Sequence, residues 1–138
     1  MPMIKVIFGD KGIGKTKFLL DDVNEVVKES KGEIVFIDTS SSHMTNVRHE
    51  IRYVNISEFP IKSLNELFGF LCGLIAENYD ITSIYMDGID TFDETCDNIP
   101  GFLSKVKTLE TKYNTSFIFS STGKMNNLPD FVATEFSK

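Results

Sequence analysis

Short apolar runs alternate along the chain with segments whose apolar residues recur every three or four positions. The runs at 4–8, 33–38, 81–87 and 116–120 predict strands, and the nearly continuous apolar run 33–38 is expected for a strand covered on both faces of a sheet. A fifth run, 131–136, alternates between apolar and polar residues and predicts a fifth strand. Because strands alternate with helical segments, the pattern is typical of an α/β protein with a mostly parallel sheet.

Two segments between the strands have the spacing of amphipathic helices. Apolar residues recur at helical intervals from Thr16 to about Ser30, and Lys31-Gly32 is expected to end that helix. A later helix is expected to follow Pro100, a residue suited to the first helical turn. The residues predicted for its inner side are Phe102, Leu103, Val106 and Leu109.

A further helix is predicted between Ser63 and about Asn78. Ser63-Leu64-Asn65-Glu66 has the form of a capping box, with Ser63 as the N-cap and Glu66 reaching back. This segment is apolar almost all round, and Gly69 and Gly73 lie on one face. A buried helix is favoured here over a contact with another subunit.

The segment 39–60 has the least regular pattern. It begins with the polar run 39–43, which predicts a loop, and one interpretation places a short strand at 51–56. No low-complexity tract, repeat or change of composition divides the chain. The sequence therefore predicts one domain over residues 1–138, which is a common domain length.

Composition narrows the choice of function. The chain has 41% hydrophobic and 25% charged residues, which is ordinary for a globular protein. Its net charge is −6, and Arg48 and Arg52 are its only arginines. Because nucleic-acid affinity depends largely on Lys and Arg neutralising phosphates, a nucleic-acid partner is disfavoured.

Nothing in the sequence predicts insertion into a membrane. The longest strongly apolar stretch, 67–76, is too short to span a bilayer, and the first residues lack the long apolar core of a signal peptide. Cys72 and Cys96 have no metal-ligand spacing and do not indicate a disulfide-stabilised secreted fold. A cytoplasmic location without a membrane span is the expectation.

The stretch GDKGIGKT, Gly9 to Thr16, follows the first predicted strand and precedes a predicted helix. It fits the phosphate-loop pattern G-x-x-x-x-G-K-[ST]. Glycines allow the backbone to curve so that N–H groups point at phosphates, and the helix N-terminus adds positive charge. Lys15 would reach the β- and γ-phosphates. The residues predicted to bind the phosphates are Gly9, Asp10, Lys11, Gly12, Ile13, Gly14, Lys15, Thr16 and Lys17.

A second motif supports the first. Ile84-Tyr85-Met86-Asp87 is an apolar strand that ends in an acid, which is the form of a Walker B element. Such an aspartate helps to hold Mg²⁺ beside a phosphate loop, and the hydroxyl of the loop Ser or Thr is a ligand. The sequence therefore predicts a magnesium site made by Thr16 and Asp87.

With these two motifs the chain resembles the P-loop NTPases over nearly its whole length. The order of the phosphate loop, a strand ending at Asp38, the strand ending at Asp87 and a strand ending Ser120-Ser121-Thr122 resembles the RecA-like and AAA-like branch in a minimal, single-domain form. The resemblance implies a three-layer fold with a mostly parallel five-stranded sheet, strand order 5-1-4-3-2, and helices on both faces. It also implies that Ser121 or Thr122 lies near the γ-phosphate, and Ser121 is included among the binding residues.

Hydrolysis needs a group that polarises the attacking water. Many members of this branch have a glutamate directly after the Walker B aspartate, but this chain has Gly88 there. Asp38 and Asp90 are the candidates for this role, with Asp38 slightly favoured, and Lys15 is the third predicted catalytic residue. Arg48 and Arg52 could act as arginine fingers toward another subunit, although surface positions are favoured for both.

These features predict an ATP-binding protein that is a weak or partner-dependent Mg-ATPase. The main alternative is a nucleotide-dependent switch or scaffold that does not hydrolyse ATP, because the usual glutamate is missing. A small-molecule kinase is less favoured, since such enzymes use several arginines. ATP is preferred to GTP because no N-K-x-D motif is present. A protein partner or a homo-oligomer is also expected.

Overall fold

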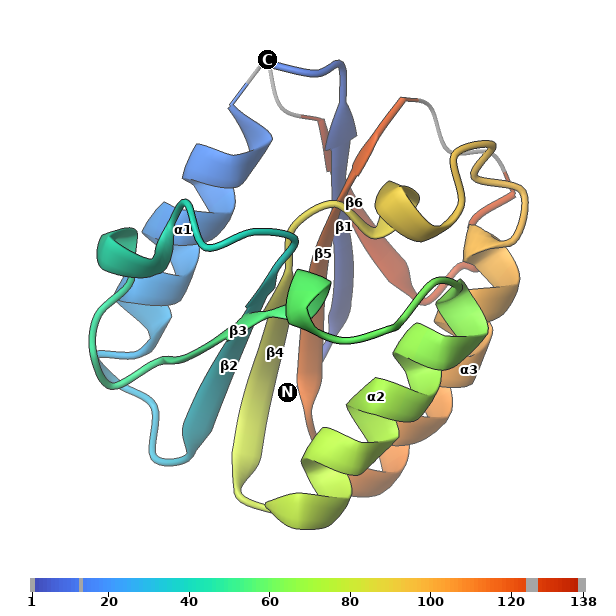
Figure 1. Cartoon of the computed structure of the whole chain (residues 1–138). Helices are drawn as coiled ribbons and strands as arrows, with labels where there is room; N and C mark the ends of the chain where they lie inside the picture. Colours follow the sequence, from blue (N-terminus) through green and yellow to red (C-terminus); the bar gives the residue numbers. More distant parts are fainter. Residues whose placement is uncertain (1, 13, 124–126, 137–138) are drawn as a thin grey trace.

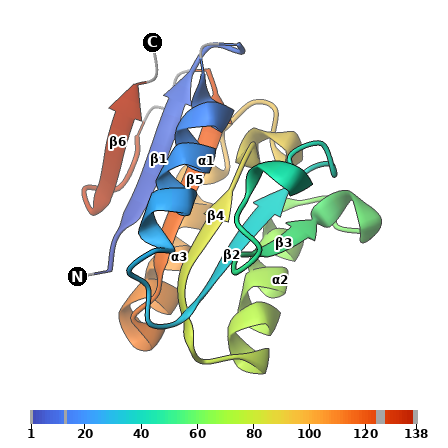
Figure 2. The ribbon, with the colours of Figure 1, turned by 90° about the vertical axis from the view of Figure 1, so that its left-hand side faces the viewer.

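In the part of the chain that the structure describes, six parallel strands form one sheet at the centre of the molecule (Figures 1 and 2). The computed structural model describes residues 2–12, 14–123 and 127–136, with the backbone only at 136. The order across the sheet is β3-β2-β4-β5-β1-β6. The strands are β1 (Ile4–Gly9), β2 (Glu33–Asp38), β3 (Arg52–Asn55), β4 (Ile81–Met86), β5 (Ser116–Thr122) and β6 (Val132–Phe136).

The sheet differs from the five-stranded sheet expected from the sequence in its strand count and its order. The difference is β3, which pairs in parallel with β2 over Arg52–Asn55 and forms one edge of the sheet. Its burial pattern contains a single fully buried residue, Val54. Such a short and largely uncovered strand has a weak hydrophobic pattern, so its pairing depends on contact with β2 rather than on a local signal.

Helices cover both faces of this sheet. Helix α1 (Lys15–Val26) lies on one face, and α2 (Leu64–Glu77) and α3 (Ile99–Tyr113) lie side by side on the other (Figures 1 and 2). Each face has its own apolar core. Leu19 and Val23 of α1 pack in one, while the inner residues of α2 and α3 pack in the other. The expectation of three layers agrees with this arrangement.

Helix α2 is amphipathic rather than buried all round. Its first turn is capped as predicted, since the Ser63 hydroxyl accepts a hydrogen bond from the Glu66 N–H. The Glu66 carboxylate, however, accepts from the N–H of Lys62 at 2.6 Å, one residue before the expected partner. Gly69 and Gly73 lie on the exposed side, and a Cβ at either position would have no atom within 4 Å.

The described residues also contain three short 3₁₀ turns, which are η1 (Met44–Asn46), η2 (Ile56–Glu58) and η3 (Ile89–Phe92). Because all strands are parallel, their carboxyl ends meet at one edge of the sheet, at the top of Figure 1. The first residues after β1, β2 and β4 therefore lie at this edge, which is where open α/β sheets generally bind their ligands. In the described ranges no helix is long and apolar enough to cross a membrane.

Candidate functional site

The loop between β1 and α1 is built around glycines. Gly12 and Gly14 have φ angles of 86° and 99°, in the left-handed region that side chains with a Cβ rarely adopt. Gly14 is the N-cap of α1, and the helix begins at Lys15. The loop therefore curves back over the carboxyl end of β1. The backbone N–H groups of the first helical turn have no acceptor within the helix, so they are available to an anion at this point.

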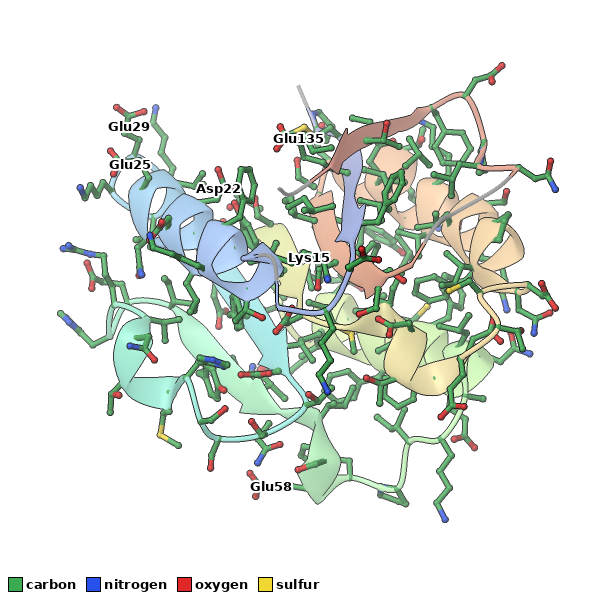
Figure 3. The ribbon with its side chains drawn as sticks, turned by 90° about the horizontal axis from the view of Figure 1, so that it is seen from above. Lys15, Asp22, Glu25, Glu29, Glu58 and Glu135 are labelled. Carbon is green, nitrogen blue, oxygen red and sulfur yellow. The ribbon has the colours of Figure 1, made fainter. Side chains whose placement is uncertain are left out.

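Lys15 lies in the middle of this edge when the molecule is seen from above the strand ends (Figure 3). It is only 8% exposed, and its ammonium donates to the carbonyl oxygens of Gly9 at 2.9 Å and Asp10 at 2.8 Å. No acid pairs with it among the described residues. The positive charge of Lys15 is thus held against carbonyl oxygens of the loop, and Lys15 also lines the pocket described below.

Thr16 and Asp87 meet although they are 71 residues apart. The Thr16 hydroxyl donates to Asp87 Oδ2 at 2.7 Å. The other carboxylate oxygen, Oδ1, accepts from the Ser120 hydroxyl at 2.6 Å, and the Asp87 N–H donates to the carbonyl oxygen of Ile37 at 3.1 Å. Contacts from α1, β5 and β2 therefore fix the Asp87 carboxylate beside the start of α1.

Ser120 is a site residue that the sequence analysis missed. It is 1% exposed, and besides its bond to Asp87 its hydroxyl accepts the N–H of Gly88 at 2.8 Å. Ser121, which was expected at the site, is on the opposite face of β5, where its hydroxyl lies 3.9 Å from the Cys96 sulfur. Because side chains alternate along a strand, Ser120 and Thr122 share the face that Ser121 does not.

A pocket of about 500 Å³ opens beside these residues. Its phosphate-loop side is formed by Lys11, Gly12, Gly14, Lys15 and Thr16. Its remaining wall comes from the ends of β2, β4 and β5 and from η3, with Thr39, Asp87, Gly88, Asp90, Thr91, Ser120 and Thr122. Two motifs identified separately in the sequence thus contribute to the same cavity.

Several predicted phosphate-binding residues lie outside this wall. Gly9 contributes its carbonyl oxygen to Lys15 rather than lining the pocket. Asp10 is exposed, and Lys17 forms an exposed ion pair with Asp21 at 2.7 Å. Ile13 lies outside the described residues. The binding roles of these positions stay predictions.

The Asp38 carboxylate is buried and fully engaged. It is 2% exposed, and Oδ1 accepts the N–H of Thr39 at 2.8 Å. Oδ2 accepts from the Tyr53 hydroxyl at 2.5 Å and from His43 Nδ1 at 2.9 Å. Burial, followed by the hydrogen bond to Asp38, raises the pKa of Tyr53 well above its usual range, so Tyr53 remains a neutral donor. This arrangement suits a structural acid better than a base acting on water.

Asp90 has a different environment. It lies in the pocket wall, and its Oδ1 accepts the N–H of Thr122 at 3.1 Å. No second hydrogen bond to the Asp90 carboxylate is found within the described part of the chain, although its backbone carbonyl oxygen accepts the N–H of Asp93 at 3.1 Å. Of the two candidate bases, Asp90 therefore has an oxygen available in the pocket, and Asp38 does not. The catalytic role of either residue stays a prediction.

The two arginines lie outside the pocket wall. Arg48 pairs with Glu50 at 3.3 Å, and Arg52 at the edge of the sheet is 3.6 Å from Glu77. Both are exposed. Within this chain they form surface ion pairs, which agrees with the favoured interpretation from the sequence.

The donor set next to Lys15 fits a magnesium ion. Mg²⁺ prefers oxygen ligands and commonly takes one or two protein oxygens while phosphates and waters complete its shell. The Thr16 hydroxyl and the Asp87 carboxylate are such oxygens. Over the described residues there is no group of three or more His, Cys, Asp or Glu that could hold a metal alone. Phosphate oxygens or waters would therefore have to complete the metal shell.

No model of a known protein family matches the chain, and no curated protein shows significant similarity to it. The function must therefore be inferred from the chemistry of the pocket. That pocket combines a loop whose glycines have left-handed φ angles, the buried Lys15, and the hydrogen-bonded pair of Thr16 and Asp87 at the N-terminus of α1.

Proposed function

We propose that this protein binds a nucleoside triphosphate, with ATP preferred, together with Mg²⁺ in the pocket beside Lys15. We further propose that it hydrolyses the nucleotide slowly, or only when a partner completes the site. The family implied by this proposal is the P-loop NTPases, in the RecA-like and AAA-like branch.

One observation carries the proposal most directly, the 2.7 Å hydrogen bond between Thr16 and Asp87. The sequence places these residues in two separate motifs, each of which predicts a ligand of the same metal ion. If the two motifs had separate functions, a contact between these oxygens would not be expected. Their contact at the mouth of a glycine-rich loop therefore supports a common function for both motifs.

Each residue has a distinct part in the proposed complex. The loop glycines let the backbone approach the phosphates, and the N–H groups at the start of α1 donate to them. Lys15 would neutralise charge on the β- and γ-phosphates. Thr16 and Asp87 would hold Mg²⁺, which when bound neutralises charge on the phosphate oxygens. Ser120 keeps the Asp87 carboxylate oriented through its 2.6 Å hydrogen bond.

Binding is tested by titrating the purified protein with Mg-ATP and Mg-ADP in a calorimeter. Lys15→Ala is expected to remove measurable binding, because it deletes the cation held over the loop. Lys28→Ala is the matched control, since Lys28 is an exposed lysine just beyond the end of α1 and is paired with Glu25. If the wild-type protein binds neither nucleotide at millimolar concentration, the proposal is wrong.

Hydrolysis is tested separately by phosphate release from Mg-ATP. Asp90→Asn is expected to reduce release at least about 100-fold while leaving binding in place, as for removal of a general base. Asp38→Asn tests the alternative base. An unchanged rate in Asp90→Asn would exclude Asp90 as the base.

A specific observation favours the second candidate function, a switch that binds but does not hydrolyse. The residue after Asp87 is Gly88, and the Asp38 carboxylate is already engaged by three donors. Nucleotide binding without phosphate release, in the presence of any partner tested, would support this candidate. A protein partner or homo-oligomer, the preference for ATP and a cytoplasmic location stay predictions.

A further inference from the structure

Thr39 occupies a particular place in the pocket wall. It is the first residue after β2, and β2 lies next to β4 on the side away from β5 and β1. Along the carboxyl edge of the sheet, the phosphate loop after β1, Asp87 after β4 and Thr39 after β2 therefore follow one another in that order. Thr39 is on the far side of the proposed metal ligand from the loop.

The backbone around Thr39 is held by a buried network. The Thr39 N–H donates to Asp38 Oδ1 at 2.8 Å, and Asp38 is held in turn by Tyr53 and His43. The carbonyl oxygen of Ser40 lies 2.8 Å from the same Tyr53 hydroxyl, so the single hydroxyl proton is shared between this oxygen and Asp38. The residues directly before and after Thr39 are thus both tied to the Tyr53 side chain, which comes from β3.

The Thr39 hydroxyl is left available by this arrangement. Within the described residues it has no hydrogen-bond partner, and Thr39 is half-buried in the pocket wall. A fixed backbone with an unengaged hydroxyl is a preorganised donor, which binds a ligand at little further cost in conformational entropy. Because the hydroxyl is neutral, it adds a hydrogen bond without adding charge.

We propose that Thr39 contacts the terminal phosphate and makes the pocket discriminate between a nucleoside triphosphate and a diphosphate. This inference rests on the proposed function. The phosphates nearest the nucleoside would lie in the loop, and the last one would lie toward Asp87, where Thr16 and Asp87 hold the metal. A residue beyond Asp87 then meets the third phosphate and has no contact with a diphosphate.

The Asp38–Tyr53–His43 network has a positioning role in this proposal. Tyr53 does not line the pocket, so it acts on the ligand only through Asp38 and the backbone at Thr39. Removing its hydroxyl loosens that backbone without deleting a group that touches the nucleotide.

The test compares affinities for Mg-ADP and for Mg²⁺ with a non-hydrolysable ATP analogue, both measured by calorimetry. Thr39→Val removes the hydroxyl and keeps the shape of the side chain. It is expected to weaken the triphosphate analogue about 10-fold or more, as for loss of a hydrogen bond to a charged group, and to leave Mg-ADP within about twofold. Thr39→Ser keeps the hydroxyl and is expected to retain the preference. Thr45→Val, at an exposed position in η1, is the control.

Tyr53→Phe supplies an independent measurement. A positioning role predicts a smaller loss in the same direction, confined to the triphosphate analogue. A merely structural role would weaken both ligands equally.

The outcomes separate this inference from the proposed function. If the wild-type protein binds both ligands and Thr39→Val keeps their affinity ratio, Thr39 does not contact the terminal phosphate, and the proposed function stands. If Thr39→Val weakens both ligands equally, the inference is also wrong. If the wild-type protein binds neither ligand, the proposed function itself fails.

Discussion

Replacing Ser120 with alanine tests the geometry of the site without assuming any ligand. The Ser120 hydroxyl donates to the Asp87 carboxylate at 2.6 Å and accepts the Gly88 N–H at 2.8 Å, and the residue is 1% exposed. The neighbouring Ser121 is 0% exposed, and its nearest partners are the carbonyl oxygen of Thr122 at 3.5 Å and the Cys96 sulfur at 3.9 Å. The two serines are therefore a matched pair on opposite faces of one strand.

The expected cost follows from the two bonds that Ser120→Ala removes. A hydrogen bond to a charged group contributes about 1.5–3 kcal/mol, and a buried N–H left without a partner costs about 1–3 kcal/mol. The pocket adjoins Asp87, so water can replace part of the lost contact, and the lower end of each range applies. Ser120→Ala should lower the free energy of unfolding by about 2–3 kcal/mol. Ser121→Ala should lower it by less than about 1 kcal/mol, because its contacts are long.

Urea denaturation followed by far-UV circular dichroism measures both variants, since the chain has no tryptophan for fluorescence. A loss of this size should also lower Tm by roughly 6–12 °C in a domain of this length. Equal destabilisation of the two variants would contradict the assignment of faces. A change below about 0.5 kcal/mol in Ser120→Ala would show that the hydroxyl does not hold the Asp87 carboxylate.

Three further predictions concern the rest of the fold. Gly32→Ala should lower the free energy of unfolding by about 1–3 kcal/mol, because its Cβ would lie 2.2 Å from the Asp80 carbonyl oxygen. Gly69→Ala, on an open helical face, should raise the free energy of unfolding by about 0.5–1 kcal/mol. Urea titration measures both variants, and a Gly69→Ala variant less stable than Gly32→Ala would contradict the packing. Asn114→Ala should lower the free energy of unfolding by about 1–2 kcal/mol, because residue 114 is the C-cap of α3 and has a left-handed φ of 58°. Asn114→Gly should not lower it, because glycine adopts this φ readily. Equal melting temperatures for the two variants would contradict the prediction. Burial, more than nearby acids, raises the pKa of the Cys96 thiol, so a smaller fraction is thiolate at pH 8 and alkylation by iodoacetamide, followed by peptide mapping, should be slower than for an unstructured cysteine. Equal alkylation rates for Cys96 and an unstructured cysteine would contradict the raised pKa of Cys96.

Most helices and strands could be predicted because their signals are local. β2 was predicted at 33–38 from its apolar run, and a helix was predicted to follow Pro100. The structure has Glu33–Asp38 there, and α3 (Ile99–Tyr113) begins one residue before that proline, which lies in the first helical turn. β3 could not be placed in the sheet from its own residues. It has only four residues at an edge, so its pairing depends on the partner strand β2.

Some residues of the candidate site could likewise be predicted from the sequence, and others could not. The loop from Gly9 to Thr16 and the acid at Asp87 are short motifs, and each is recognisable in consecutive residues. The choice of Ser120 over Ser121 depends on which face of β5 points at Asp87, and a shift of one residue reverses it. The pairing of β5 with β1, in which Thr122 lies opposite Gly9, fixes which face of β5 each serine occupies.

The sequence alone thus established the alternation of strands and helices, the glycine loop and the residue types able to bind phosphate and Mg²⁺, because these features depend on neighbours along the chain. The fold decided the rest. Only the parallel sheet brings Thr16 to Asp87 across 71 residues, and only the pairing of β3 beside β2 buries Asp38 under Tyr53. Contacts between distant residues follow from strand order and register, and these are set by the packing of the whole core.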